Sequence, residues 1–155
     1  MTIEEKLAEM GLVLPAKRES KAIFVPIRIV GNIAYISGHG PLKADGSVTD
    51  KRGKVGVDLT VEEGKEQAQL TMLAILASLK EALGDLERVK AWIKLLGMVN
   101  CPPDFAEQPS VINGASELII TLWGEERGAH TRAAVGMGSL PGQIPVEIEA
   151  MVEIE

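Results

Sequence analysis

The C-terminal segment 146–154 alternates apolar and polar side chains with a period of two. One set is wholly aliphatic and the other holds three glutamates and a methionine: Val146, Ile148, Ala150, Val152 and Ile154 against Glu147, Glu149, Met151 and Glu153. Successive side chains of a β-strand point to opposite faces of its sheet. The pattern therefore predicts a strand with one face in a core, and the rest of the chain must cover that face.

Two long helices are predicted to supply the cover. The first has a capping box in Thr60 and Glu63, an apolar stripe along its length and Gly84 at its end. The second is expected over residues 109–122. Its apolar residues fall on one inward stripe: Val111, Ile112, Ala115, Leu118, Ile119 and Leu122.

Apolar runs bounded by turn residues predict the remaining strands. Segments 24–30 and 33–37 are joined by Gly31-Asn32 and have the pattern of a tight hairpin, because glycine supplies the positive φ that such a turn needs. Further strands are expected at three places: 53–57, 89–99 and 131–137. We expect the middle one of these to be covered on both faces. The last one is expected to pair antiparallel with the C-terminal strand through a turn at residues 138–142.

Strands interleaved with two long helices are typical of the α+β class, with both helices on one face of a mixed sheet. A short additional helix is expected from Thr2, whose spacing to Glu5 is again that of a capping box, and a connector follows over residues 17–20. No repeat, low-complexity tract or linker divides the sequence. We therefore expect one domain over residues 1–155, in which residues 1–20 form the N-terminal helix and connector.

Composition excludes several classes of function. The formal net charge of −6 and the 3% aromatic content argue against nucleic-acid binding, because phosphates attract cations and bases stack on rings. A single cysteine, Cys101, excludes a disulfide framework, and two distant histidines, His39 and His130, form no metal motif. No apolar run is long enough to span a membrane, and the chain begins with acidic residues. We expect a cytoplasmic protein without metal or cofactor.

Few residues suggest chemistry by position alone. Cys101 before two prolines and His39 between glycines have the ordinary interpretations of a packed thiol and a loop residue. Arg132 and Glu147 would approach each other if their strands pair antiparallel, and a guanidinium at an apolar mouth can bind a carboxylate through two parallel hydrogen bonds. Two interpretations stay open here: a surface ion pair that contributes little stability, or a carboxylate site.

The same residues carry a resemblance to a known family. The segment from Arg132 to Ala150, with Leu-Pro in its middle and Val-Glu-Ile-Glu-Ala at its end, resembles the C-terminal signature of the RidA/YjgF family, also called the L-PSP family. The hairpin ending in Ser37-Gly38 and the asparagine Asn113 in the second long helix are similar to that family as well. The resemblance covers residues 20–155, and the additional N-terminal helix is typical of a longer branch.

The resemblance implies a chorismate-mutase-like fold, assembled as a homotrimer around a central barrel, with ligand clefts between subunits. The best-known members hydrolyse 2-imino acids to 2-oxo acids and ammonia. The implied partners are therefore a small-molecule carboxylate and further copies of this chain, without a cofactor. Residue by residue, the resemblance implies that Arg132 holds the substrate carboxylate, that Glu147 and the Ala134 carbonyl orient the attacking water, and that the cleft is lined by Ser37, Gly38, Phe24 and Asn113.

Departures from the family pattern keep other functions open. Phe24 stands where the best-known deaminases have a tyrosine, and Ala134 where they often have a cysteine. The missing hydroxyl favours a non-catalytic protein that binds 2-oxo acids in the same cleft. An endoribonuclease or translation inhibitor is a weaker alternative, which the basic stretch 51–54 supports and the negative net charge opposes.

Overall fold

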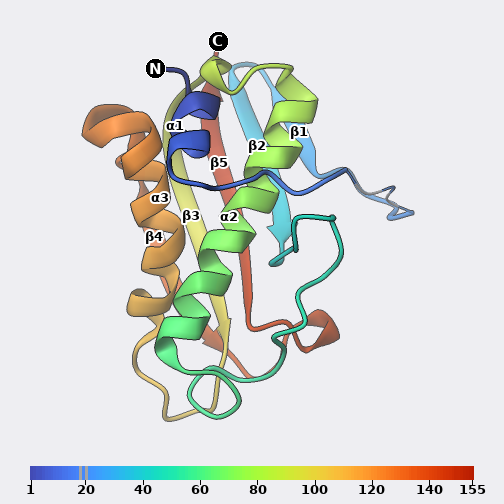
Figure 1. Ribbon diagram of the computed structural model, residues 1–155, viewed down its shortest axis with the longest axis vertical. Coiled ribbons are helices and arrows are strands. Elements are labelled where there is room, and N and C mark those ends of the chain that lie inside the picture. Colours follow the sequence, from blue (N-terminus) through green and yellow to red (C-terminus); the bar gives the residue numbers. More distant parts are fainter. Residues whose placement is uncertain (18, 20) are drawn as a thin grey trace.

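The chain folds into one five-stranded sheet with helices on one side (Figure 1). The computed structural model describes residues 1–17, 19 and 21–155. The predicted connector at 17–20 includes Arg18 and Ser20, which lie outside the described residues. In chain order the elements are α1 (Ile3–Glu9), β1 (Ile27–Val30), β2 (Ile33–His39), α2 (Val61–Leu83), η1 (Leu86–Arg88), β3 (Val89–Asn100), α3 (Gln108–Gly128), β4 (Thr131–Met137), η2 (Pro141–Gln143) and β5 (Val146–Ile154).

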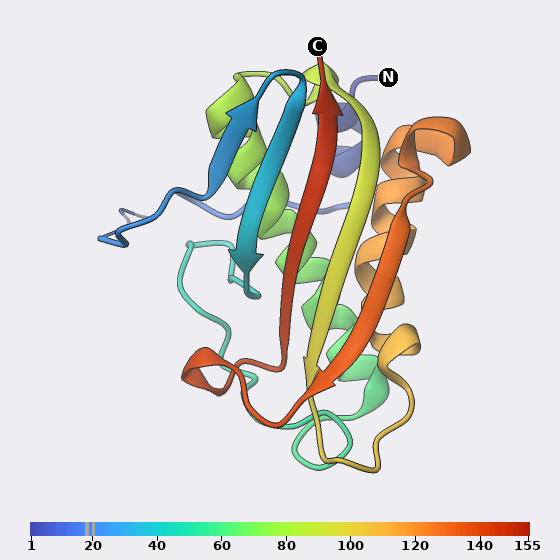
Figure 2. The same ribbon diagram turned by 180° about the vertical axis from the view of Figure 1, so that it is seen from behind.

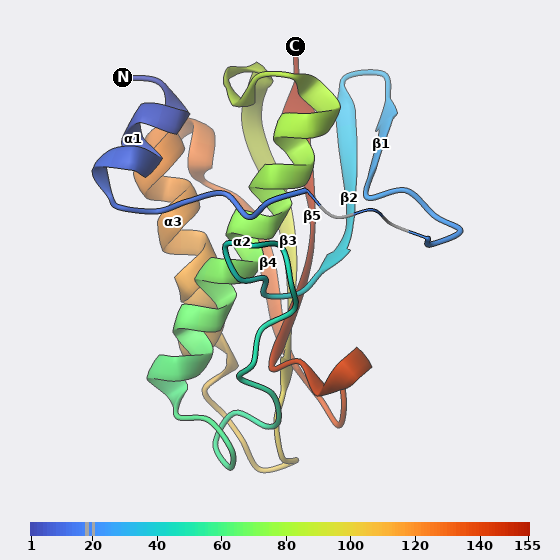
Figure 3. The ribbon, with the colours of Figure 1, turned by 45° about the vertical axis from the view of Figure 1, so that its right-hand side comes forward.

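The α+β class is confirmed. The strand order is β1-β2-β5-β3-β4, in which β3 and β4 run parallel and the other neighbours antiparallel. Figure 3 shows α2 and α3 together on one side of this mixed sheet, as expected. Within the described residues, no helix is long and apolar enough to cross a membrane.

Both predicted capping boxes are present. The Thr60 hydroxyl accepts a hydrogen bond from the Glu63 amide at 3.1 Å, and the Glu63 carboxylate accepts one from the Thr60 amide at 3.1 Å. Thr2 and Glu5 make the same exchange at the start of α1. Gly84 ends α2 in the left-handed conformation, with φ 81°. Strong local signals therefore located these helix ends correctly.

Two predicted boundaries and one predicted strand were wrong. The first strand begins at Ile27 and not at Phe24, since Pro26 lacks the amide that a paired strand position would donate. Residues 53–57 form no strand, and an isolated bridge joins Val55 to Leu59. Helix α3 continues past residue 122 to Gly128, because Gly124 adopts φ 78° and the chain resumes helical geometry after this kink.

The predicted antiparallel pairing of the last two strands was also wrong. Strand β4 lies parallel to β3 at the sheet edge, while β5 lies between β2 and β3. Residues 138–145 cross under the end of β3 to reach the other side of it (Figure 2). Asn100, fully buried at that end, donates from its amide nitrogen to the Gln143 side chain and the Ile144 carbonyl, each at 3.3 Å. The crossing is thus held by the last residue of β3.

The core lies between the sheet and α2 and α3 and is almost wholly aliphatic. The six inward residues predicted for the second long helix are all buried. Strand β3 is covered on its helix side by this core, but in the single chain its other face is not, since Lys90 and Lys94 are exposed. The expectation of cover on both faces is therefore met on one face only. The uncovered side of the sheet, called the open face below, is seen in Figure 2.

We expect Gly114→Ala to lower the free energy of unfolding by about 3 kcal/mol, because the added methyl group would overlap the Lys65 carbonyl oxygen and force α2 and α3 apart. Urea denaturation at one fixed protein concentration measures this. Gly138→Ala is the control, since nothing lies within 4 Å of a Cβ there, and it should change stability by less than about 0.5 kcal/mol. Equal effects of the two substitutions would show that the helices do not meet at Gly114.

Candidate functional site

Arg132 lies near the start of the edge strand β4, on the helix side of the sheet. It is aligned with Leu95 of β3, whose side chain is buried in the core. The guanidinium is half-buried and donates from Nη1 to Asn113 Oδ1 at 2.7 Å and to Ser116 Oγ at 3.2 Å. Asn113 and Ser116 are three residues apart on α3 and so share one helix face. Within the described part of the chain, Arg132 has no carboxylate partner.

His130 completes this cluster from the turn before β4. Its Nδ1 lies 2.7 Å from the Gly128 carbonyl oxygen, and its Nε2 lies 2.9 Å from Ser116 Oγ. A carbonyl only accepts, so the neutral ring carries its proton on Nδ1 and Nε2 accepts the Ser116 hydroxyl proton. We call Arg132, Asn113, Ser116 and His130 the arginine group. The cation of this group is the Arg132 guanidinium, and its hydrogen-bond partners are uncharged oxygens.

Glu147 lies near the start of β5 on the open face, aligned with Met98 of β3. A side chain at Gly38 would overlap the Glu147 carboxylate, so glycine is what allows β2 to approach it. Burial raises the pKa of Glu147 above its ordinary value, and the negative charge of Glu149 raises it further. The carboxyl group is thus a stronger base than a fully solvated glutamate.

Ser37 and Gly38 occupy an irregularity in β2. The register with β5 shifts between Ile36 and His39, which turns the His39 ring toward α2 and leaves Gly38 beside Glu147. Ser37 Oγ donates to the Val25 carbonyl at 2.7 Å. We call Glu147, Ser37 and Gly38 the glutamate group.

The remaining predicted residues belong to neither group. Phe24, 63% exposed, precedes β1 and lies next to the Val25 carbonyl that Ser37 binds. Ala134 is two residues after Arg132, aligned with Gly97, and packs against the core. The structure therefore brings Arg132 and Asn113 together, and separately places Gly38 beside Glu147, with Ser37 next to Gly38 in the chain.

Arg132 and Glu147 do not meet within one chain. Strand β3 separates β4 from β5, and their partners Leu95 and Met98 are an odd number of residues apart on β3. Side chains at such positions point to opposite faces. The predicted approach, which assumed antiparallel pairing, was wrong for this reason.

A hollow of about 260 Å³ on the open face adds residues that sequence reasoning missed. It is lined by Ser37 and by charged and aromatic side chains, among them Arg28, Tyr35, Lys94 and Glu149. Tyr35 is two positions before Ser37, so a period of two would have found it. Likewise Ser116 was missed although it stands three residues after Asn113 on one helix.

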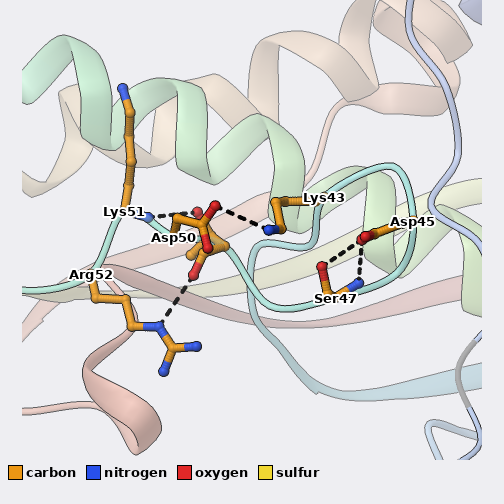
Figure 4. Close-up of polar contacts among 7 residues, drawn as sticks. Lys43, Asp45, Ser47, Asp50, Lys51 and Arg52 are labelled. Carbon is orange, nitrogen blue, oxygen red and sulfur yellow. Dashed lines mark hydrogen bonds and ion pairs between the residues drawn. The ribbon is translucent and has the colours of Figure 1, made fainter.

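The basic stretch 51–54 is engaged in holding the loop before α2. Arg52 Nε donates to the Thr49 carbonyl at 3.2 Å (Figure 4). Lys51 pairs with Glu63 at 3.0 Å, and Lys54 Nζ donates to Asn100 Oδ1 at 3.1 Å. These cations meet protein oxygens, which weakens the argument for an RNA surface. No cluster of three or more His, Cys, Asp or Glu side chains suited to a metal ion occurs among residues 1–17, 19 and 21–155.

The raised pKa of Glu147 predicts a pH-dependent stability. Above the unfolded-state pKa of about 4.3, the folded chain binds more protons than the unfolded chain, so the free energy of unfolding falls as pH rises through the folded pKa. Glu147→Gln cannot ionise, and we expect its stability advantage over wild type to grow from about pH 4 to about pH 7. Urea denaturation at several pH values tests this. Glu153→Gln is the control, because the wild-type Glu153 carboxylate pairs with Lys90 at 3.2 Å. A difference in free energy of unfolding between Glu147→Gln and wild type that does not vary with pH would contradict the prediction.

Known proteins are similar to this chain in both sequence and fold. The model of a YjgF/chorismate-mutase-like family, which carries an endoribonuclease name, matches residues 4–144. Protein TCP17 of Trypanosoma cruzi is 39% identical over 152 residues, 98% of this chain and 94% of that protein. The crystal structure of Atu1372, a protein of unknown function from Agrobacterium tumefaciens, is 46% identical with a TM-score of 0.90 and covers 99% of this chain and 94% of its own. A Shewanella oneidensis structure with an endoribonuclease name is 31% identical with a TM-score of 0.92, over 99% of this chain and all of that one (100%). The chain therefore belongs to the YjgF/chorismate-mutase-like family.

Proposed function

We propose that the protein hydrolyses 2-imino acids, or the enamines with which they exchange, to 2-oxo acids and ammonia. The observation that carries the proposal is the arginine group. Arg132 is half-buried, fixed through Nη1 by Asn113 and Ser116, and without an ion-pair partner among the described residues. A positioned guanidinium whose charge no protein carboxylate neutralises is suited to a carboxylate from outside the chain.

The chemistry needs few further groups. With the substrate carboxylate on Arg132, the protonated imine carbon is already electrophilic. Water adds to that carbon, the resulting aminoalcohol expels ammonia, and the oxygen of water becomes the 2-oxo oxygen. Glu147, whose pKa is raised by burial, can take a proton from the attacking water and return it to the nitrogen that leaves as ammonia, and the Ala134 carbonyl can help to orient that water. Orientation then supplies much of the rate gain.

The active site in this proposal spans two copies of the chain. Arg132 and Glu147 lie on opposite faces of the sheet in one copy, so a site that uses both requires the arginine group of one copy and the glutamate group of the next. A closed homotrimer gives three equivalent sites of this kind. The open face favours such an assembly, because it carries half-exposed apolar residues, among them Val30, 57% exposed, and Tyr35, 45% exposed.

We expect Arg132→Ala to lower kcat/KM for imine hydrolysis about a hundredfold, because the carboxylate loses its charged partner. The imines 2-iminopropanoate and 2-iminobutanoate are generated in situ with an amino-acid oxidase, and unreacted imine is trapped as the semicarbazone. Arg127→Ala is the matched control, since that guanidinium, in the last turn of α3, binds the Val89 and Lys90 carbonyls and not the arginine group, and it should leave turnover unchanged. Wild-type turnover that survives in Arg132→Ala would contradict the role of Arg132.

Mixing two inactive variants tests the shared site. Arg132→Ala and Glu147→Gln each remove one half, so each should be inactive alone. After the two are unfolded together and refolded at equal amounts, random assembly should give about one quarter of all sites, which is one site in each mixed trimer, an intact Arg132 together with an intact Glu147 from the neighbour. Recovery of activity to about that level supports a site between copies. No recovery from mixed trimers, or a stable monomer in sedimentation of the wild type, would overturn it.

A non-catalytic sensor of 2-oxo acids is the alternative that one observation favours. Phe24 offers no hydroxyl and lies exposed outside strand β1, so it cannot hydrogen-bond a water as a tyrosine could. Binding of 2-oxobutanoate that depends on Arg132, together with no imine turnover by the wild type, would favour the sensor over the enzyme.

A further inference from the structure

Two histidines in this chain make the same set of hydrogen bonds. In each, Nδ1 lies close to the carbonyl oxygen two residues earlier, at 2.6 Å for His39 and 2.7 Å for His130. In each, Nε2 meets a serine hydroxyl on a long helix, Ser78 on α2 at 2.8 Å or Ser116 on α3 at 2.9 Å. Both imidazoles therefore tie one end of a strand to a helix.

The two pairs differ in what else the serine binds. Ser116 Oγ also accepts a hydrogen bond from Arg132 Nη1 at 3.2 Å, whereas no side-chain cation of the described residues donates to Ser78. A hydroxyl has one proton and two lone pairs. Because His130 takes the Ser116 proton, a lone pair of Ser116 is left to face the guanidinium.

These hydrogen bonds determine which edge of the Arg132 guanidinium is free. Asn113 and Ser116 both bind Nη1, and Nε and Nη2 have no protein partner within the described residues. Nε and Nη2 form one side of the planar fork, which matches the two oxygens of a carboxylate. A long arginine side chain that is held in one orientation loses less conformational entropy when it binds.

We propose that His130 is a positioning residue for carboxylate binding, acting on Arg132 through Ser116. The proposal rests on the proposed function, in that Arg132 is taken to hold the carboxylate. Without an acceptor on His130, the Ser116 hydroxyl would turn to the helix carbonyl four residues earlier, as serines in helices do. Its lone pair would then leave Arg132, which would be held by Asn113 alone.

The test measures 2-oxobutanoate binding to the assembled protein by titration calorimetry. His130→Phe keeps a ring but removes the acceptor, and we expect it to raise Kd about tenfold, as for the loss of one hydrogen bond to a charged group. His130→Gln keeps an acceptor and should stay within about threefold of wild type. Ser116→Ala removes the link itself and should match His130→Phe.

Ser78→Ala is the matched control, because it removes the same kind of histidine–serine bond where no guanidinium is involved. Ser116→Ala and Ser78→Ala should lower the melting temperature similarly, but only Ser116→Ala should raise Kd. Equal Kd values for wild type, Ser116→Ala and Ser78→Ala would overturn the positioning role and leave His130 as a structural tie only.

Arg132→Ala separates this inference from the proposed function. If Arg132→Ala abolishes binding while His130→Phe and Ser116→Ala bind as wild type does, the inference is wrong and the carboxylate anchor stands. If Arg132→Ala binds 2-oxobutanoate as tightly as wild type, the anchor itself is wrong. Loss of binding in Arg132→Ala, with graded weakening in His130→Phe and rescue in His130→Gln, supports both.

Discussion

The connection from β3 through α3 to β4 determines where the candidate groups lie. Two parallel neighbouring strands need a crossover, and here α3 provides it on the helix side of the sheet. The crossover puts β4 at the sheet edge and packs α3 directly behind it. Arg132 therefore meets Asn113 and Ser116 of α3, and β5 is left to fill the centre of the sheet.

This arrangement gives Arg132 and Glu147 different electrostatic surroundings. Arg132 lies at an edge with uncharged oxygens around it, so its charge is held in place without being neutralised. Glu147 lies on a partly buried surface near a second carboxylate, and both conditions disfavour its ionised form. Arg132 can bind a negative charge and Glu147 can accept a proton, and the proposed hydrolysis needs both roles.

Local structure was largely predictable from the sequence, but pairing was not. The two capping boxes, Gly84 and the alternation of residues 146–154 are signals that lie within a few residues of the features they specify. The neighbours of a strand depend on the whole chain. Residues 138–145 suit a turn as well as a crossing, and the crossing is held by distant residues, among them buried Asn100, which binds Gln143 and Ile144. The resemblance to a family named Arg132, Glu147 and Asn113, and their roles stay predictions. It could not name Ser116 or His130, which become visible only when α3 and β4 are seen together.

The aliphatic core has a consequence for spectroscopy. The chain has two tryptophans, and both are buried in one contact, Trp92 of β3 against Trp123 of α3, with ring centroids 5.3 Å apart and planes at 71°. Their indole nitrogens have no hydrogen-bond partner within the described residues. Intrinsic tryptophan fluorescence therefore reports on a single junction between helix and sheet. A change in tryptophan emission therefore indicates a change at that junction. Neither the open face nor the edge of β4 carries an indole, so this signal does not report on them directly.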